Sequence, residues 1–133
     1  MFYDLSLTIP PNTTKLAPLE RDFLLCRGVI NHLEIGFPPG CAGLAHLQIG
    51  RTGAQLWPTN PQGSFSTDGY NIVFDEAYEL YFEPYQVGLT AWNLDDTYPH
   101  TLEVRIGIAP MPAVHVRETA AELSHRLLER IGL

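Results

Sequence analysis

Apolar and polar residues alternate with a period of two through most of the first 108 residues of this chain. In "DLSLTI", the apolar side chains are Leu5, Leu7 and Ile9, with polar residues between them. The segment "HTLEVRIGI", at 100–108, repeats the pattern near the end of the alternating region. Successive side chains of a β-strand point to opposite faces, so this alternation predicts half-buried strands. No helical period interrupts it, which argues against parallel strand–helix–strand units.

Turn-forming residues separate the alternating segments. "PPG" at 38–40 ends one predicted strand, and "RTG" at 51–53 predicts a tight turn. The polar segment 59–71 predicts a loop that crosses from one sheet to the other. The segments 85–94 and 100–108 form the clearest pair of strands, and we expect them to be joined as a hairpin. About seven or eight strands at this spacing indicate an all-β, antiparallel β-sandwich or barrel.

The sequence changes character after residue 109. We expect residues 1–109 to form the β-domain, 110–116 to form a proline-containing connector, and 117–133 to form an amphipathic α-helix. Thr119 and Glu122 have the spacing of a capping box near the start of that helix. Its apolar stripe consists of Ala120, Leu123, Leu127, Leu128 and Ile131.

The stripe on this C-terminal helix needs a partner, because an isolated helix of this length is marginally stable in water. Its own β-domain and a neighbouring subunit are the two alternatives. A helix that follows a completed β-domain through a stiff connector favours the neighbouring subunit. The predicted contact residues between copies of the chain are Leu123, Leu127, Leu128 and Ile131.

The charge balance narrows the possible partners. The net charge is −7, with a single lysine, Lys15, and no basic run, so binding to a nucleic-acid backbone would lack its main source of energy. The chain has no stretch of about 18 apolar residues, so no membrane span is predicted. The N-terminal segment lacks the pattern of a signal peptide, which makes the cytoplasm of the producing cell the expected place of synthesis. Only 17% of the residues are charged, and this favours a surface that partners partly cover.

The two cysteines, Cys26 and Cys41, lie in apolar surroundings and form neither a CxxC motif nor a zinc-binding pattern. We expect both to be buried free thiols, because free cysteine behaves as a small hydrophobic residue. The chain also has no GxSxG motif around Ser64 and no phosphate-binding glycine loop. These observations favour a chain without a catalytic centre or a cofactor.

The segment "AWNLDDTYPH", at 91–100, is rich in residues that bind metals or form turns. Asp95 and Asp96 suit turn positions because their side chains accept hydrogen bonds from nearby backbone N–H groups. We expect a hairpin tip here. The alternative is a calcium site, which needs six or more oxygen ligands and would have to recruit Asp68 or Glu83.

Three histidines raise the question of a transition-metal site. If the early strands pair with each other, His32 and His46 would share a face with Glu34, and His100 begins the last strand. A small metal-dependent barrel enzyme would use such a group. No HxH motif occurs, which favours solvent-facing or hydrogen-bonded histidines over metal ligands.

Aromatic side chains concentrate in the second half of the alternating region. They are Trp57, Tyr70, Tyr78, Tyr81, Phe82, Tyr85, Trp92 and Tyr98. Large aromatic residues usually fill a core or a subunit interface, and we expect that role here. The alternative is a carbohydrate-binding module in which exposed Trp and Tyr side chains stack on sugar rings.

The strand pattern as a whole resembles the small jelly-roll virion proteins of tailed bacteriophages, the trimeric decoration or cement proteins of capsids. The resemblance lies in "VINHLEIGFPPGCAGLAHLQI", "LWPTNPQGSF" and "VGLTAWNLDDTYPHTLEVRIGI" and spans roughly residues 1 to 110. It implies a jelly-roll fold, a homo-oligomer such as a trimer, and a place on a virus particle. It also implies an N-terminal arm and a C-terminal helix outside the sandwich as bridging elements. No active-site residue is carried over, because such proteins share none.

Overall fold

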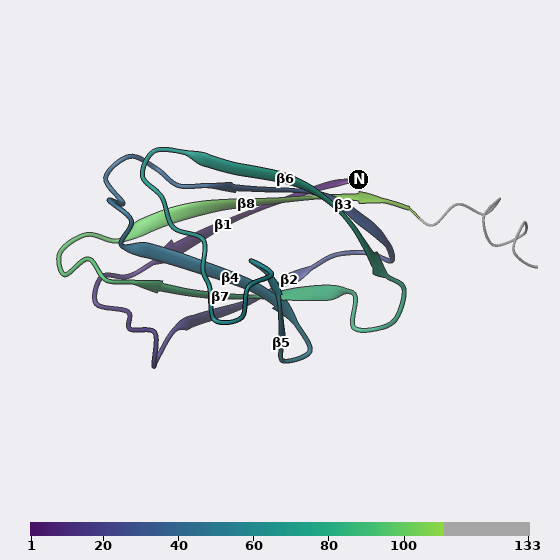
Figure 1. The fold of residues 1–133 in the computed structure, drawn as a ribbon, viewed down its shortest axis with the longest axis horizontal. Coiled ribbons are helices and arrows are strands. Elements are labelled where there is room, and N and C mark those ends of the chain that lie inside the picture. Colours follow the sequence, from purple (N-terminus) through teal and green to yellow (C-terminus); the bar gives the residue numbers. More distant parts are fainter. Residues whose placement is uncertain (111–133) are drawn as a thin grey trace, which may run out of the picture.

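The computed structural model describes residues 1–110, and these fold into two four-stranded antiparallel sheets packed face to face (Figure 1). The strands are β1 (Phe2–Ile9), β2 (Leu19–Leu24), β3 (Gly28–Gly36), β4 (Ala45–Arg51), β5 (Ala54–Trp57), β6 (Asn71–Leu80), β7 (Gln86–Asn93) and β8 (His100–Ala109). One sheet has the order β1-β8-β3-β6 and the other β2-β7-β4-β5. The predicted all-β sandwich class is confirmed for these residues.

The pairing of the strands is nested around one turn. β4 pairs with β5, β3 with β6, β2 with β7 and β1 with β8, all antiparallel. The innermost pair, Arg51 with Ala54, encloses the predicted tight turn, and the outermost joins Phe2 to Gly107. The chain therefore behaves as one long hairpin that folds over into two layers.

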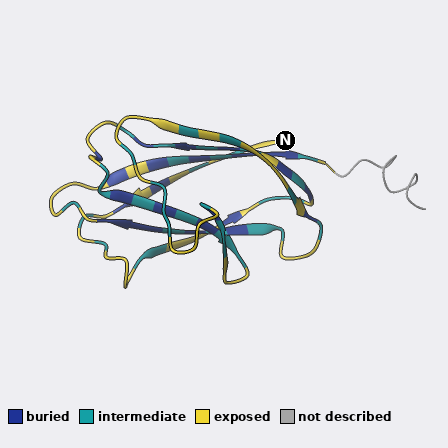
Figure 2. Ribbon diagram, in the orientation of Figure 1, coloured by how far each residue is buried: buried dark blue, intermediate teal, exposed yellow. Residues whose placement is uncertain are grey.

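The core lies between the two sheets and follows the predicted alternation. Leu7 and Ile9 of β1 are fully buried, as are Leu102 and Val104 of β8. In Figure 2, buried and more exposed residues alternate along these strands. Burial of this apolar surface is the main source of stability for a domain of this kind.

One strand departs from the simple alternation. The register of β3 shifts between Ile30 and His32 against both of its neighbours, so Asn31 is an extra, exposed residue. Ile30 is therefore buried and Val29 only half-buried, whereas an uninterrupted alternation over residues 29–37 would place Val29 with Leu33 on the inner face. A β-bulge inserts one residue and reverses the phase of the strand before it.

The expected hairpin between residues 85–94 and 100–108 is wrong. β7 pairs with β2 and β4, and β8 pairs with β1 and β3 in the other sheet. Segment 94–99 thus connects the two sheets. The expected arm is also wrong, because β1 pairs with β8 over its whole length and belongs to the sandwich.

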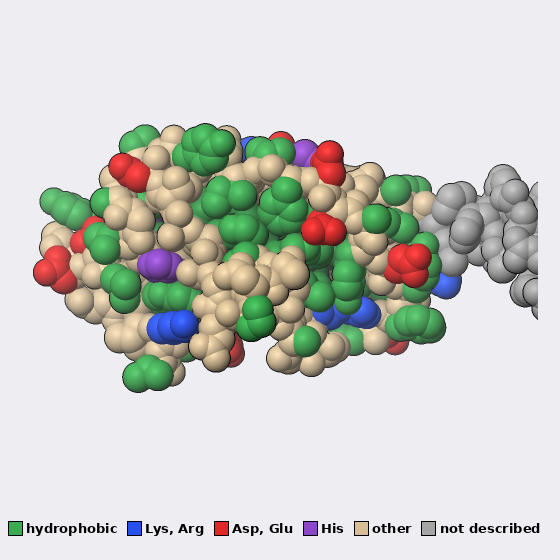
Figure 3. Space-filling model, in the orientation of Figure 1, with side chains coloured by type: hydrophobic (Ala, Val, Ile, Leu, Met, Phe, Trp, Pro, Cys, Tyr) green, Lys and Arg blue, Asp and Glu red, His purple; other side chains and the backbone are tan. Residues whose placement is uncertain are grey.

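Aromatic side chains fill the side of the sandwich between the edge strands β5 and β6. Trp57 contacts Phe74 and Tyr78 at ring-centroid distances of 6.3 and 5.7 Å, and Phe65 contacts Phe74 at 5.7 Å. Figure 3 shows hydrophobic side chains gathered at the centre of the face that looks toward the viewer. The loop before β6 crosses from one sheet to the other, as the sequence predicted.

Residues 111–133 lie outside the described part of the chain, and with them most of the predicted connector at 110–116 and all of the predicted helix at 117–133. Within residues 1–110, no helix is long and apolar enough to cross a membrane.

Candidate functional site

The predicted contact residues Leu123, Leu127, Leu128 and Ile131 lie outside the described residues. The candidate sites within residues 1–110 are the segment at 91–100, the histidines, the aromatic side chains and the two hollows on the surface.

The segment at 91–100 is a turn organised by Asp95. Its Oδ1 atom accepts hydrogen bonds from the backbone N–H groups of Thr97 at 2.9 Å and Tyr98 at 3.2 Å. Its Oδ2 atom contacts Nε2 of His100 at 2.9 Å. The Thr97 N–H bond, with the His100 bond next, holds the pKa of Asp95 below its usual range. The predicted turn is confirmed, although it joins two sheets and is no hairpin tip.

The calcium alternative receives no support from the described residues. The side chain of Asp68 accepts a hydrogen bond from the backbone N–H of Gly40 at 2.8 Å. The backbone N–H groups of Ala42 and Gly40 lower the pKa of Asp68, so this carboxylate fastens one loop to another. Glu83 precedes β7, whereas Asp95 follows it, so the two lie at opposite ends of that strand. No cluster of three or more His, Cys, Asp or Glu suited to a metal occurs within residues 1–110.

The histidines do not share a face. His32 belongs to β3 in one sheet, whereas His46 belongs to β4 in the other, so these strands do not pair and the condition for a shared face is not met. The Nδ1 atom of His46 contacts Oγ of Ser64 at 2.9 Å, and its ring stacks on Trp92 at 5.2 Å. Burial in this position lowers the pKa of His46. The Ser64–His46 pair lines neither of the two hollows described below.

A row of alternating charges crosses the outer face of the sheet β1-β8-β3-β6. Arg105 lies between Asp4 and Glu34, with N–O distances of 3.5 and 3.6 Å. His32 follows, with its ring nitrogens 3.1 Å from Glu34 and 2.7 Å from Asp75. Asp75, followed by Glu34, raises the pKa of His32. This charged row gives the sheet a hydrophilic outer face and contributes little to stability, because exposed ion pairs are weak.

The aromatic side chains do not form the exposed tryptophan platform of the carbohydrate-binding alternative. Trp57 and Trp92 are only 5% and 4% exposed, so both serve packing. Tyr70, Phe82 and Tyr98 are exposed, but they lie on three separate loops. The expectation that large aromatic residues fill the core is confirmed for Trp57, whereas Trp92 is buried outside the core cluster, where its ring stacks on His46.

The cysteines differ in burial. Cys41 is fully buried and Cys26 is half-buried, and both are free. Burial is the first cause that raises the pKa of the Cys41 thiol, which makes it a poor nucleophile. The prediction of buried free thiols holds for Cys41 and only in part for Cys26.

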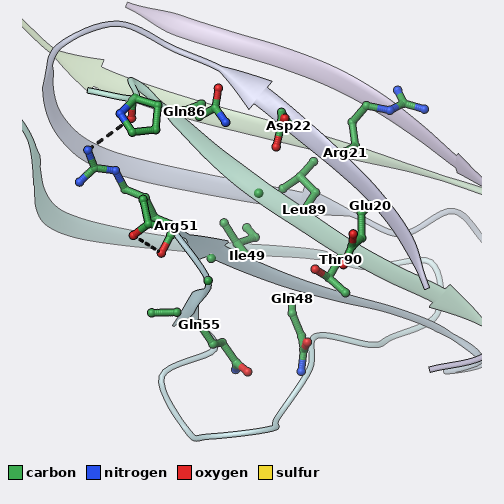
Figure 4. Close-up of a pocket in the computed structure, with 16 residues that line it drawn as sticks. Glu20, Arg21, Asp22, Gln48, Ile49, Arg51, Gln55, Gln86, Leu89 and Thr90 are labelled. Carbon is green, nitrogen blue, oxygen red and sulfur yellow. Dashed lines mark hydrogen bonds between the residues drawn. The ribbon is translucent and has the colours of Figure 1, made fainter. Parts of the chain in front are cut away.

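A groove of about 570 Å³ crosses the outer face of the sheet β2-β7-β4-β5 (Figure 4). Gly50 of β4 and Gly88 of β7 lie opposite each other in register and leave the floor without side chains. Asp22 of β2 lies opposite Gly88 on one side, and Gln55 of β5 lies opposite Gly50 on the other. These four residues form one row across all four strands.

Several side chains of the groove are held in place by neighbouring loops. The Nε2 atom of Gln48 donates to the carbonyl of Gly63 at 2.8 Å, and that of Gln55 donates to the carbonyl of Pro58 at 2.7 Å. The guanidinium of Arg51 donates to the carbonyls of Phe82 and Pro84. Its Nε atom is buried without a partner among the described residues. Hydrogen bonds thus hold the side-chain amides of Gln48 and Gln55 at the border of the groove. The guanidinium of Arg51 is already bound to backbone carbonyls.

A second hollow of about 660 Å³ lies at the end of the other sheet. Its wall includes Pro38, Pro39 and Pro99, together with Thr101 and Glu103. The proline rings are apolar, whereas the threonine and glutamate side chains offer hydrogen-bonding groups, so the wall of this hollow combines the two kinds of surface.

The sequence did not predict the groove. Gly50 and Gly88 lie at positions that alternate with the buried residues of their strands, where polar residues are usual. Only the register between strands about 40 residues apart brings them together. No protein-family model and no curated protein sequence matches this chain. Function therefore has to be inferred from the geometry of the chain itself.

Proposed function

We propose that this chain is a non-enzymatic structural subunit of a virus particle, a capsid decoration or cement protein. It assembles into a homo-oligomer, a trimer, and stabilises the particle by bridging neighbouring subunits. Anything that binds only to the assembled state stabilises that state by mass action.

The strand order is the observation that carries the proposal. The orders β1-β8-β3-β6 and β2-β7-β4-β5, with nested antiparallel pairs, support the proposal that the sandwich is an eight-stranded jelly roll built from two Greek keys. Viral capsid domains use this arrangement, as do lectins and cupins. Fold alone does not assign a function, so the surface of the molecule has to distinguish a capsid protein from a lectin or a cupin.

The exposed surface favours protein contacts over chemistry. Leu16, Leu94 and Tyr98, called here the loop-end residues, are exposed apolar side chains on two loops, with Leu16 98% exposed. The two loops that carry these residues are joined by the hydrogen bond from Asn12 N to the Asp95 carbonyl at 2.8 Å. Exposed apolar groups that gather at one end of a domain are typical of interaction surfaces. Of the histidines of the metal-enzyme alternative, in contrast, His46 lies on a different sheet from His32 and His100.

The experiment that tests the proposal is a light-scattering measurement of native mass on the full chain and on a Leu127→Asp, Ile131→Asp double variant. The proposal predicts an oligomer for the natural chain and a lower mass for the variant, because a buried aspartate without a partner is costly. A matched control exchanges the exposed Thr101 of the sandwich for Asp and leaves the mass unchanged. Unchanged assembly in the double variant would count against the predicted contact.

A further inference from the structure

Gly88 is a glycine that the fold does not require. It lies in the interior of β7, a central strand, where glycine weakens a sheet relative to alanine. Its φ angle is not positive, and a Cβ atom at this position would meet only the Gly50 carbonyl oxygen, at 3.8 Å. Gly50 differs, because a Cβ there would lie 2.5 Å from the Ala54 carbonyl oxygen. Glycine in the interior of a strand often marks a bulge, a bend, or a place where a ligand or another backbone approaches closely, and no register shift occurs at Gly88.

The absence of a side chain at Gly88 has one visible consequence, the groove on the outer face of its sheet. The row beside the two glycines runs from Glu20 through Thr90 to Gln48. These side chains border the glycine floor, and Figure 4 shows Gln48 and Thr90 beside it. A side chain at position 88 would fill the middle of this space.

The groove presents polar groups that no described residue uses. Glu20 and Asp22 offer carboxylates, Gln86 an amide and Thr90 a hydroxyl, and none of these four side chains has a hydrogen-bond partner within residues 1–110. The carboxylates accept, while the amide and the hydroxyl both donate and accept. The set suits a ligand that carries donors and acceptors side by side.

We propose that this groove binds a neutral oligosaccharide, whose hydroxyl groups donate to the carboxylates of Glu20 and Asp22 and accept from Gln86 and Thr90. The site is a polar groove, in place of an exposed tryptophan platform, which residues 1–110 do not form. It adds a ligand site to the proposed function and stands independently of assembly, because the groove is complete within one chain.

Other occupants fit the groove less well. An apolar protein surface would bury two carboxylates without partners, which is costly. A phosphate or another anion would meet these carboxylates, while the guanidinium of Arg51 is engaged by the carbonyls of Phe82 and Pro84. Arg21 is directed away from the glycine floor in Figure 4. The volume of the groove, about 570 Å³, is within the range of ligand clefts.

The test uses the full chain on a printed array that carries neutral gluco-, galacto-, manno-, xylo- and N-acetylglucosamine oligosaccharides beside sialylated and sulfated ones. Calorimetry then gives the affinity for the neutral glycan that binds. We expect Asp22→Asn to weaken binding by about tenfold or more, the loss expected for one hydrogen bond to a charged group. Asp4→Asn, in the edge strand of the other sheet, is the matched control and leaves the affinity unchanged.

Gly88→Val tests the floor of the groove. It is expected to abolish binding and to leave the thermal unfolding midpoint unchanged or higher, because valine suits a strand. Gly88→Ala provides a smaller obstruction should the valine variant unfold. Absence of neutral glycan binding on the array, or full binding by a folded Gly88→Val protein, would overturn the proposal. Native mass measured on the same variants separates a failure of this site from a failure of assembly.

Discussion

At the scale of single residues, the same side chain acquires different properties from its neighbours. His32 lies between two carboxylates on an open face, and its pKa is raised. His46 lies half-buried against Trp92, and burial lowers its pKa. At neutral pH the positive charge therefore belongs more to His32 than to His46.

The stability that the charged row contributes is expected to depend on pH through His32. The pKa of His32 is higher in the folded state than the value of about 6.5 in an unfolded chain. Its stabilising contribution is thus complete below that value and is lost as the pH rises through the folded-state pKa. Asp75→Asn should lower the His32 pKa, because Asp75 is the largest cause of the shift. An NMR titration of the His32 ring measures this, and an unchanged pKa would refute the role of Asp75.

The stability that Asp95 contributes is expected to depend on pH in the opposite direction. Its pKa is depressed by the Thr97 N–H group and by His100, so its contribution is present above the ordinary aspartate pKa of about 3.9. That contribution is lost as the pH falls through the lower folded-state pKa. Asp95→Ala should destabilise the protein at pH 7 and reduce the further loss on acidification. Urea unfolding at several pH values checks both effects, and Asp96→Ala, whose carboxylate is bonded only to the Thr97 side chain, is the control.

At the scale of elements, two glycines that face each other in register are expected to respond differently to the same substitution. Gly50→Ala places a Cβ 2.5 Å from the Ala54 carbonyl oxygen, so the β4–β5 pair must shift. We expect a loss of about 1–3 kcal/mol in the free energy of unfolding. Gly88→Ala meets nothing closer than 3.8 Å and is expected to be neutral or stabilising. Equal losses in urea unfolding would contradict the reason given for each glycine.

The alternation of residues was sufficient to predict most strands, because burial of one face is a local property of the chain. It succeeded for Leu5, Leu7 and Ile9, which are half-buried or buried, whereas the polar residues between them are exposed. It failed at Val29, because an inserted bulge residue reverses the phase without any signal in composition. It failed again for 85–94 and 100–108, because alternation shows which residues face inward but not which strand lies alongside.

The groove could not be predicted for a related reason. Gly50 and Gly88 are each unremarkable in their own strands, and only their pairing creates the floor. The histidines depend on register too, because His32 and His46 lie on different sheets and are hydrogen-bonded, as the favoured interpretation predicted. Long-range register decides both cases, and it depends on the whole set of strand pairs.

At the scale of the whole molecule, a nested hairpin folded into two layers leaves two outer faces with different chemistry. One carries the charged row, and the other carries a glycine-floored groove with two carboxylates and one amide that no described residue binds. The loop-end residues Leu16, Leu94 and Tyr98 add exposed apolar side chains at one end. A subunit that contacts its neighbours through its ends and its C-terminal segment would leave both outer faces accessible.

The central claim is that the chain is an assembling subunit, and its native mass tests that claim most directly. Light scattering of the full chain over a range of concentrations is compared with that of a chain ending at Ala113. The account predicts three times the chain mass of 14.9 kDa for the full chain and a single chain mass for the shortened form. A full chain that stays monomeric at every concentration would contradict the account.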